Sequence, residues 1–405
     1  MRSTTKFPLE AELDLCSFLK FSWENGWLDE YSNDHFLIKA IENRLVHFVA
    51  IEQLINNNIN FVNMVNPDGS INSNHFNLNF CINFSRRLEG LYHDFGEDAI
   101  KRFITDQLSA GKHNYSEDAF FQALSEISIL SFFTSLREWT KIIYEPPVVN
   151  GVNNKNPEAS FCGVFECKDQ ADSHEHVEKS ITLNVEVKSP QFPHDSHTNE
   201  KIVIPTVLLS PEGKENVKNF CKENNIRYLD PRVLKIRDFI NSATSKFNIP
   251  EQDEYNILYI NWSFRDFPSN AFLEAWSLLT NEKNGILIHQ KYAEEIGVNP
   301  EAFEKISAIV VYTESLEGIA FSDFRYVWQQ NGAGQRFRMW IINDELRQLE
   351  REGKSDIVFN ITRMRPSDPL TQYVMIDGKS KNDSERVESA YLAYQLHNVI
   401  KENIS

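Results

Sequence analysis

A carboxylate and an ammonium group stand two residues apart in the run SITLNVEVKSP, which covers residues 180–190. Apolar and polar residues alternate along this run, and the alternation predicts a β-strand with Glu186 and Lys188 on one face. A carboxylate beside an ammonium group near a strand end can hold a metal ion and steady a nucleophilic water. The alternative is an ordinary ion pair on an exposed strand, which would contribute little to stability.

A second carboxylate is expected on the neighbouring strand. The run EASFCGVFECK starts at Glu158 and is typical of a strand, and the polar loop DQADSHEHVE after it predicts a hairpin. We expect Lys168 to pair with Lys179 where the hairpin closes. Glu158 then faces Ser189 and lies within a few residues of Glu186. Because paired strands are about 4.8 Å apart, the two carboxylates are expected to share one cation.

A helix is expected before these strands, from Ser116 to about Trp139. Ser116 is a favoured N-cap, and Glu117 and Asp118 follow in the first turn, where the helix dipole favours acids. Glu126 lies among apolar residues of this helix and is a third candidate acid. The alternative for Glu126 is a solvated side chain at the boundary of the core.

In this order, the features of residues 115–190 resemble the PD-(D/E)XK nuclease superfamily, which includes many restriction endonucleases. The family pattern has a helix bearing a Glu, a strand, an acidic residue usually preceded by Pro, and E-x-K on the next strand. The matching residues are Glu126, Pro157-Glu158 and Glu186-Val187-Lys188. The chain departs from the pattern at Glu158, where the family usually has Asp. The extra methylene moves the carboxylate outward, and Mg²⁺ is strict about geometry.

The resemblance implies a restriction-endonuclease-like core and a Mg²⁺-dependent deoxyribonuclease, with Mn²⁺ as a substitute metal. Its implied metal ligands are Glu158, Glu186 and the carbonyl of Val187. Glu126 would help directly or through water, and Lys188 would orient or activate the water that attacks phosphorus. DNA is the implied substrate and RNA is an alternative. The implied biological setting is defence against foreign or phage DNA.

A competing hypothesis keeps the nuclease fold without its chemistry. In that hypothesis the site is degenerate, and the chain is a non-catalytic interaction or regulatory protein. Metal binding together with metal-dependent nicking of plasmid DNA would separate the two hypotheses.

Apolar periodicity and turn residues predict further elements. Helices are expected at residues 36–55, 212–224, 231–247, 344–352 and 385–403. Strands are expected at residues 141–149, 202–210, 255–263, 285–290, 307–315 and 356–364. The order of helix, three strands, helices and a further strand indicates an α/β (α+β) fold with a mixed sheet.

The interpretation divides the chain into three parts. Residues 1–112 would form a helical N-terminal domain with a regulatory or assembly role, through which the chain forms a homo-oligomer or binds a partner protein. Residues 113–320 would form the nuclease-like domain, and residues 321–405 a C-terminal extension.

The composition indicates in which cellular compartment the protein is expected. Of the 405 residues 41% are hydrophobic, enough for a sizeable core. No stretch approaches the about 18 apolar residues of a membrane span, and the first residues are acidic where a signal peptide needs an apolar run. The five cysteines are scattered and odd in number, which fits reduced thiols. We therefore expect a cytoplasmic protein that does not bind membranes.

The net charge of −17 argues against a protein that coats nucleic acid, because Lys and Arg hold the phosphate backbone. Residues 331–365 are the exception, with seven basic and five acidic side chains and a net charge of +2. Arg336 and Arg338 in this segment are the candidate nucleic-acid contacts. The alternative is a solvated helix with salt bridges.

Replacing both Arg336 and Arg338 by Ala tests this surface. We expect DNA affinity to fall, and the slope of log affinity against log salt to decrease by about 0.9 for each lost phosphate contact. Fluorescence anisotropy at several salt concentrations measures both quantities. An unchanged affinity and salt slope would remove these arginines from the interface.

Overall fold

The structure is a computed structural model of the 405-residue chain. It describes residues 1–9, 15–43, 73–135, 139–146, 156–168, 176–190, 211–224, 233–262, 275, 278–279, 285–312, 319, 337–342, 346 and 373–375.

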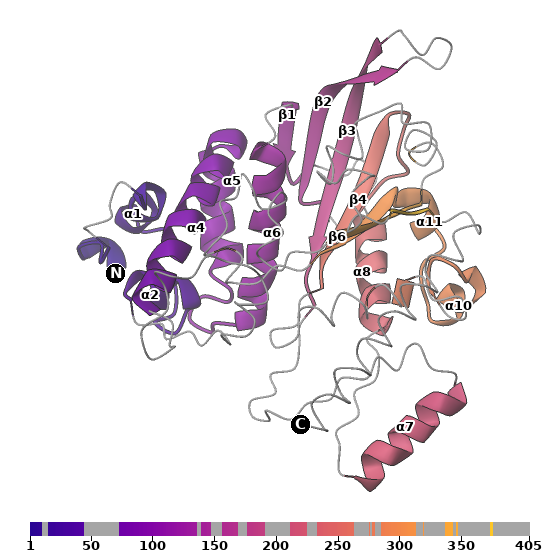
Figure 1. Ribbon diagram of the computed structural model, residues 1–405. Coiled ribbons are helices and arrows are strands. Elements are labelled where there is room, and N and C mark those ends of the chain that lie inside the picture. Colours follow the sequence, from indigo (N-terminus) through magenta and orange to yellow (C-terminus); the bar gives the residue numbers. More distant parts are fainter. Residues whose placement is uncertain are drawn as a thin grey trace.

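A seven-stranded mixed sheet runs through the described part of the chain, with its strands in the order β1 to β7 (Figure 1). The first three strands form an antiparallel meander. The next two strands are each parallel to the strand before them, β6 is antiparallel to β5, and β7 is parallel to β6. The strands are β1 (Trp139–Tyr144), β2 (Ala159–Lys168), β3 (His176–Lys188), β4 (Glu254–Asn261), β5 (Ala308–Tyr312), β6 (Phe337–Ile341) and β7 (Tyr373–Met375). The predicted mixed α/β class is confirmed.

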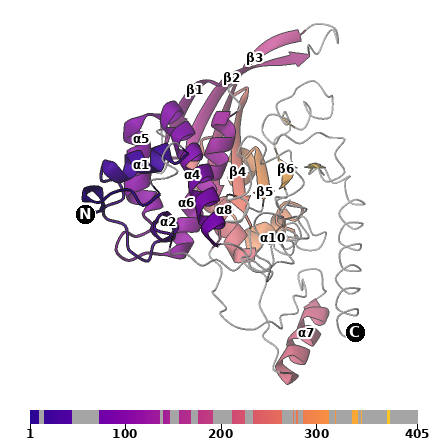
Figure 2. The ribbon, with the colours of Figure 1, turned by 60° about the vertical axis from the view of Figure 1, so that its left-hand side comes forward.

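Helices cover both faces of this sheet (Figures 1 and 2). The helices on one side come from the first third of the chain and are α1 (Ser17–Glu24), α2 (Phe36–Ile41), α4 (Ser73–Phe95), α5 (Glu97–Arg102) and α6 (Glu117–Ser135). The helices on the other side are α8 (Val233–Lys246), α10 (Gln290–Glu295) and α11 (Ala302–Lys305). The remaining helices are η1 (Arg2–Thr4), η3 (Phe103–Leu108) and α7 (Pro211–Glu223). In the described part of the chain, no helix has the length and apolar character needed to cross a membrane.

Side chains alternate between the two faces of the sheet, and each face contributes to a different hydrophobic core. Val185 and Val187 of β3 belong to the core shared with the N-terminal helices, whereas Leu258 and Ile260 of β4 belong to the core on the α8 side. Glu186 pairs with Leu258 in the parallel β3–β4 ladder, so it lies on the face that α8 covers. The valines of the E-x-K strand therefore anchor one core, while its charged residues face the other layer.

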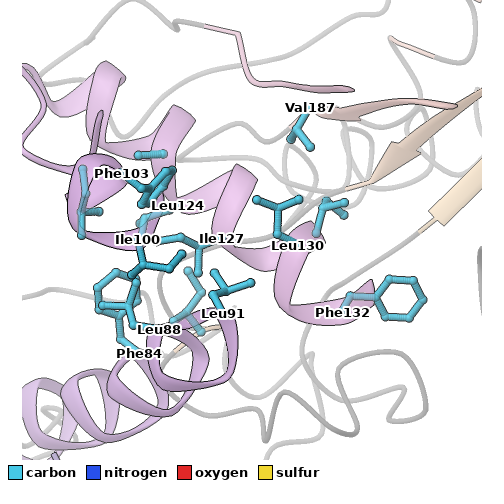
Figure 3. Packing of buried hydrophobic residues seen from close by; sticks show 14 of the residues in the cluster. Phe84, Leu88, Leu91, Ile100, Phe103, Leu124, Ile127, Leu130, Phe132 and Val187 are labelled. Carbon is cyan, nitrogen blue, oxygen red and sulfur yellow. The ribbon is translucent and has the colours of Figure 1, made fainter. Parts of the chain in front are cut away.

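The core on the α6 side draws on all three expected parts of the chain. Figure 3 shows Ile127 and Leu130 of α6 near Leu88 and Leu91 of α4, and Val187 of β3 belongs to the same cluster. This cluster extends from Phe7 to Leu346. Strands β6 and β7, which lie beyond residue 320, add to the sheet of the middle part. Among the described residues, the boundaries at 112 and 320 therefore do not separate independent cores.

Two element boundaries differ from the predicted ones, and for β1 a local backbone constraint explains the difference. Helix α6 ends at Ser135 rather than near Trp139. The strand predicted at residues 141–149 is β1, which starts at Trp139 and ends at Tyr144. Glu145 follows with a φ of 46°, and prolines come next. A left-handed residue and a proline both interrupt strand pairing, which explains the early end.

The strand predicted at residues 285–290 is wrong. The segment is a turn in which the amides of Ile288 and His289 both donate to the carbonyl of Gly285, and α10 begins at Gln290. Ile286 is fully buried in the core on the α8 side. The apolar run therefore reflects burial of a turn and not an extended strand.

Most other elements appear close to their predicted positions. The helices expected at 212–224 and 231–247 are α7 and α8, and the strands expected at 255–263 and 307–315 are β4 and β5. Helix α2 occupies the start of the helix expected at 36–55. The rest of that helix from residue 44 lies outside the described residues, as do the strands expected at 202–210 and 356–364, the helix expected at 385–403, and nearly all of the helix expected at 344–352.

His35 ties the start of α2 to a distant segment. Its Nδ1 accepts a hydrogen bond from the amide of Leu37, and its Nε2 lies 2.9 Å from the carbonyl of Leu108. This pattern assigns the proton of the neutral ring to Nε2. Burial lowers the pKa of His35 from 6.5 to about 4. Protonation would add a second hydrogen at Nδ1 and displace the cap.

We expect this histidine to limit stability in acid. Because the unfolded chain takes up the proton first, the free energy of unfolding should fall as the pH drops from about 6.5 toward about 4, by on the order of 3 kcal/mol. His35→Asn keeps a side-chain acceptor for the cap but does not titrate. Its free energy of unfolding should be lower than that of the wild type at pH 7, but should depend less on pH between pH 4 and pH 7. Urea unfolding between pH 4 and pH 7 measures both. Equal slopes for the two proteins would contradict this role.

Candidate functional site

The β2–β3 hairpin brings the two expected carboxylates directly opposite each other. The ladder pairs Ala159 with Val185, and the amide of Glu158 donates to the carbonyl of Val185. Glu158 therefore faces Glu186. The expected register was wrong by three residues, because Lys168 pairs with His176 and not with Lys179. Residues 176–178, expected in the loop, belong to β3, so fewer residues separate the two paired strands than expected.

A lysine that the sequence did not single out joins the two carboxylates. Lys246 is the last residue of α8. Its Nζ lies 3.0 Å from Oε1 of Glu158, and 2.8 Å and 3.0 Å from Oε1 and Oε2 of Glu186. Glu158 and Glu186 therefore share one cation, which in this structure is the ammonium group of Lys246.

Lys188 makes the second ion pair of the site. Its Nζ lies 2.5 Å from Oε1 of Glu186, and it contacts this carboxylate from the strand end. The side chain of Glu186 is fully buried and that of Lys188 is 16% exposed. The alternative of an ordinary ion pair on an exposed strand is therefore wrong. Two lysines therefore hold the carboxylate of Glu186.

Burial and the neighbouring charges shift the pKa values of Glu186 and Lys246. Burial, followed by repulsion from Glu158, raises the pKa of Glu186 to about 7 even though Lys188 and Lys246 oppose this shift. Burial alone would lower the pKa of Lys246, but Glu186 and Glu158 outweigh it and raise that pKa. Lys246 is therefore held as an ammonium, and the positive charge between the carboxylates is maintained.

Glu126 lies buried on α6, within electrostatic range of the pair. Burial raises its pKa well above the usual value, and repulsion from Glu158 adds to the shift. Its Oε1 accepts a hydrogen bond from Gln122, whereas its buried Oε2 has no hydrogen-bond partner among the described residues. The alternative of a solvated boundary residue is wrong, because Glu126 is only 6% exposed. An unpaired buried oxygen is costly and marks a place for a proton, a water or a cation.

Gln122 connects α6 to the end of β3. Its Nε2 donates to the carbonyl of Val187 at 3.1 Å, and its Oε1 accepts from the amide of Ser189 at 2.7 Å. The carbonyl of Val187, an implied metal ligand, therefore already accepts one hydrogen bond and keeps one lone pair. Gln122 stands four residues before Glu126, and this spacing on a helix was the signal that the sequence offered for it.

The carboxylates fit a divalent cation in donor type. Carboxylate oxygens suit Mg²⁺, which binds them at about 2.0–2.1 Å and keeps several waters. Oxygens of Glu158 and Glu186 already lie within 3.0 Å of one point, so movements of about 1 Å would bring them to that distance. No group of three His, Cys, Asp or Glu side chains in the described ranges is gathered as a complete metal centre. An ion here would take two carboxylates and complete its shell with water.

The register also places Arg338, which lies in β6 and not in a helix. Lys188 pairs with Ile260, Ile260 with Val311, and Val311 with Arg338. The two basic residues therefore stand in one row across the sheet, three strands or about 14 Å apart. Arg336 lies outside the described residues.

No family model, curated protein or solved structure matches this chain. The geometry of these residues is therefore the basis of the functional argument.

Replacing Glu126 by Gln tests whether this residue is held protonated. Because its pKa is raised in the folded state, the folded chain keeps the proton more tightly, and the free energy of unfolding should fall as the pH rises above 4.5. Glu126→Gln should make this decline shallower and should be at least as stable as the wild type at pH 8. Urea unfolding between pH 5 and pH 8 measures the slope.

Glu294→Gln, an exposed change on α10, is the matched control and should keep the wild-type slope. Parallel curves for the wild type and Glu126→Gln would contradict the raised pKa.

Proposed function

We propose that the chain is a Mg²⁺-dependent nuclease that hydrolyses phosphodiester bonds of DNA, with a restriction-endonuclease-like core. The observation that carries the proposal is the buried pair of Glu158 and Glu186, opposite each other in the hairpin, with Lys188 on the same face. The order α6, β1, β2, β3 supports it, since this is the succession of helix, strands and E-x-K that the resemblance implied.

In this proposal each residue of the site has a separate task. Glu158 and Glu186 hold the cation, with the remaining lone pair of the Val187 carbonyl as a further donor. Mg²⁺, when bound, supplies a polarised phosphoryl oxygen and a more acidic water. Lys188 lies beside Glu186 and stabilises the charge that grows on the phosphate oxygens, or holds the attacking water. Glu126 offers its free buried oxygen to a water of this site.

The row from Lys188 to Arg338 supports nucleic acid as the substrate. The two positions are about 14 Å apart in one row across the sheet, a separation that fits two non-adjacent phosphates of one backbone. DNA remains the proposed substrate and RNA the alternative. Mn²⁺ would replace Mg²⁺. A cytoplasmic role in defence against foreign DNA, with assembly through the N-terminal helices, is proposed by analogy with the family.

The second candidate is a non-catalytic interaction or regulatory protein. The position of Lys246 favours it, because an ammonium group already bridges the two carboxylates. In such a protein the lysine would have replaced the metal permanently and the fold would serve only as a scaffold.

Lys188→Ala separates the two candidates. The nuclease proposal predicts a loss of plasmid nicking of about 10²–10³-fold, since one preorganised charged group is removed. The fold should persist because Lys246 still neutralises Glu186. Nicking of supercoiled DNA with Mg²⁺, Mn²⁺ or EDTA and thermal melting are measured together.

Lys179→Ala is the matched control. This lysine lies on the same strand and pairs with Asp253, about 30 Å from Lys188 along β3. Equal nicking by the wild type and Lys188→Ala would show that Lys188 takes no part in the chemistry. If the wild type does not cut with either metal, the non-catalytic candidate is the better one.

A further inference from the structure

We infer that Lys246 is a built-in cation that competes with a divalent metal for the position between Glu158 and Glu186. This inference rests on the proposed function, because it concerns how the nuclease site would be loaded. Lys246 would keep the site closed to metal until its side chain is displaced.

The ammonium of Lys246 occupies the position that a divalent metal needs. The ammonium of Lys246 touches Oε1 of Glu158 and both carboxylate oxygens of Glu186, all within 3.0 Å. A divalent cation held by the same oxygens would lie at about 2.0–2.1 Å from them. Two positive charges cannot occupy that one point, so binding of the metal and binding of the ammonium exclude each other.

The two lysines contact the carboxylates differently. Lys188 pairs with Glu186 from the end of β3, and no ion pair joins it to Glu158 among the described residues. It can remain in place beside a metal ion. Lys246 bridges both carboxylates, so it is the lysine that must leave.

Lys246 can leave this position by moving its side chain alone. Its backbone is fixed at the end of α8, because the next residue, Phe247, is buried and its amide donates to the carbonyl of Ala243. The ammonium stands on a flexible four-carbon stem and its side chain is 16% exposed. A rotation of the side chain therefore opens the position without unfolding the helix. The phosphates of a bound backbone are anions that would attract the released ammonium.

Binding of Mn²⁺ to the full chain, followed by the electron paramagnetic resonance signal of free Mn²⁺, tests this inference without any cleavage assay. Lys246→Met keeps the length of the side chain and removes its charge. We expect it to bind one Mn²⁺ at least about tenfold more tightly than the wild type, because a like charge is removed from the site. Lys246→Arg keeps the charge and should bind no better than the wild type.

Three further variants test whether the measured Mn²⁺ binds between Glu158 and Glu186. Lys246→Gln retains an N–H donor for the carboxylates and replaces Lys246→Met if the latter does not fold. Glu186→Gln in the Lys246→Met background should abolish the tight binding. Lys179→Met removes a remote lysine and should bind like the wild type.

The possible failures are distinguishable. If the wild type and the neutral Lys246 variants bind Mn²⁺ equally well at a site that needs Glu186, the competition is overturned and the proposed nuclease function stands. If no variant binds Mn²⁺, both the competition and the metal-dependent nuclease are overturned.

Discussion

The site depends on a positive charge between two buried carboxylates. Glu186 is fully buried and Glu158 is 6% exposed, and carboxylates so placed repel each other unless a cation neutralises them. The antiparallel β2–β3 pairing sets the two side chains opposite each other, and α8 packs on that face with Lys246 at its end. The rest of the fold brings these elements together. In this structure Lys246 supplies that positive charge.

The division of β3 into two faces explains how such a charged site lies within a large protein core. Val185 and Val187 anchor the strand in the core of the N-terminal helices, so Glu186 and Lys188 are directed to the other layer. Gln122 fixes the end of the strand to α6 through the carbonyl of Val187 and the amide of Ser189. These two hydrogen bonds tie the E-x-K segment to α6, and preorganised support of charged groups is what an electrostatic site requires.

The sequence predicted those residues of the candidate site that a local pattern places together, and it missed the residue that only tertiary packing brings there. Strand alternation placed Glu186 and Lys188 on one face, and the order of elements brought Glu158 and Glu126 near them. The register was off by three residues because polar loop residues can also pair in a ladder. Lys246 could not be found in this way, because it comes from a helix after the hairpin and only the tertiary packing of α8 directs it to the carboxylates. The apolar run at residues 285–290 predicts a strand but forms a turn, because burial and extension give the same apolar signal.

The central claim is that the point between Glu158 and Glu186 is a cation position that a divalent metal takes when Lys246 leaves. X-ray diffraction from crystals grown with MnCl₂, recorded at the manganese absorption edge, tests it most directly. The account predicts an anomalous peak between the two carboxylates, with the Lys246 side chain turned away and Lys188 still beside Glu186. No manganese peak at that point, with Lys246 still bridging both carboxylates at saturating MnCl₂, would contradict the account.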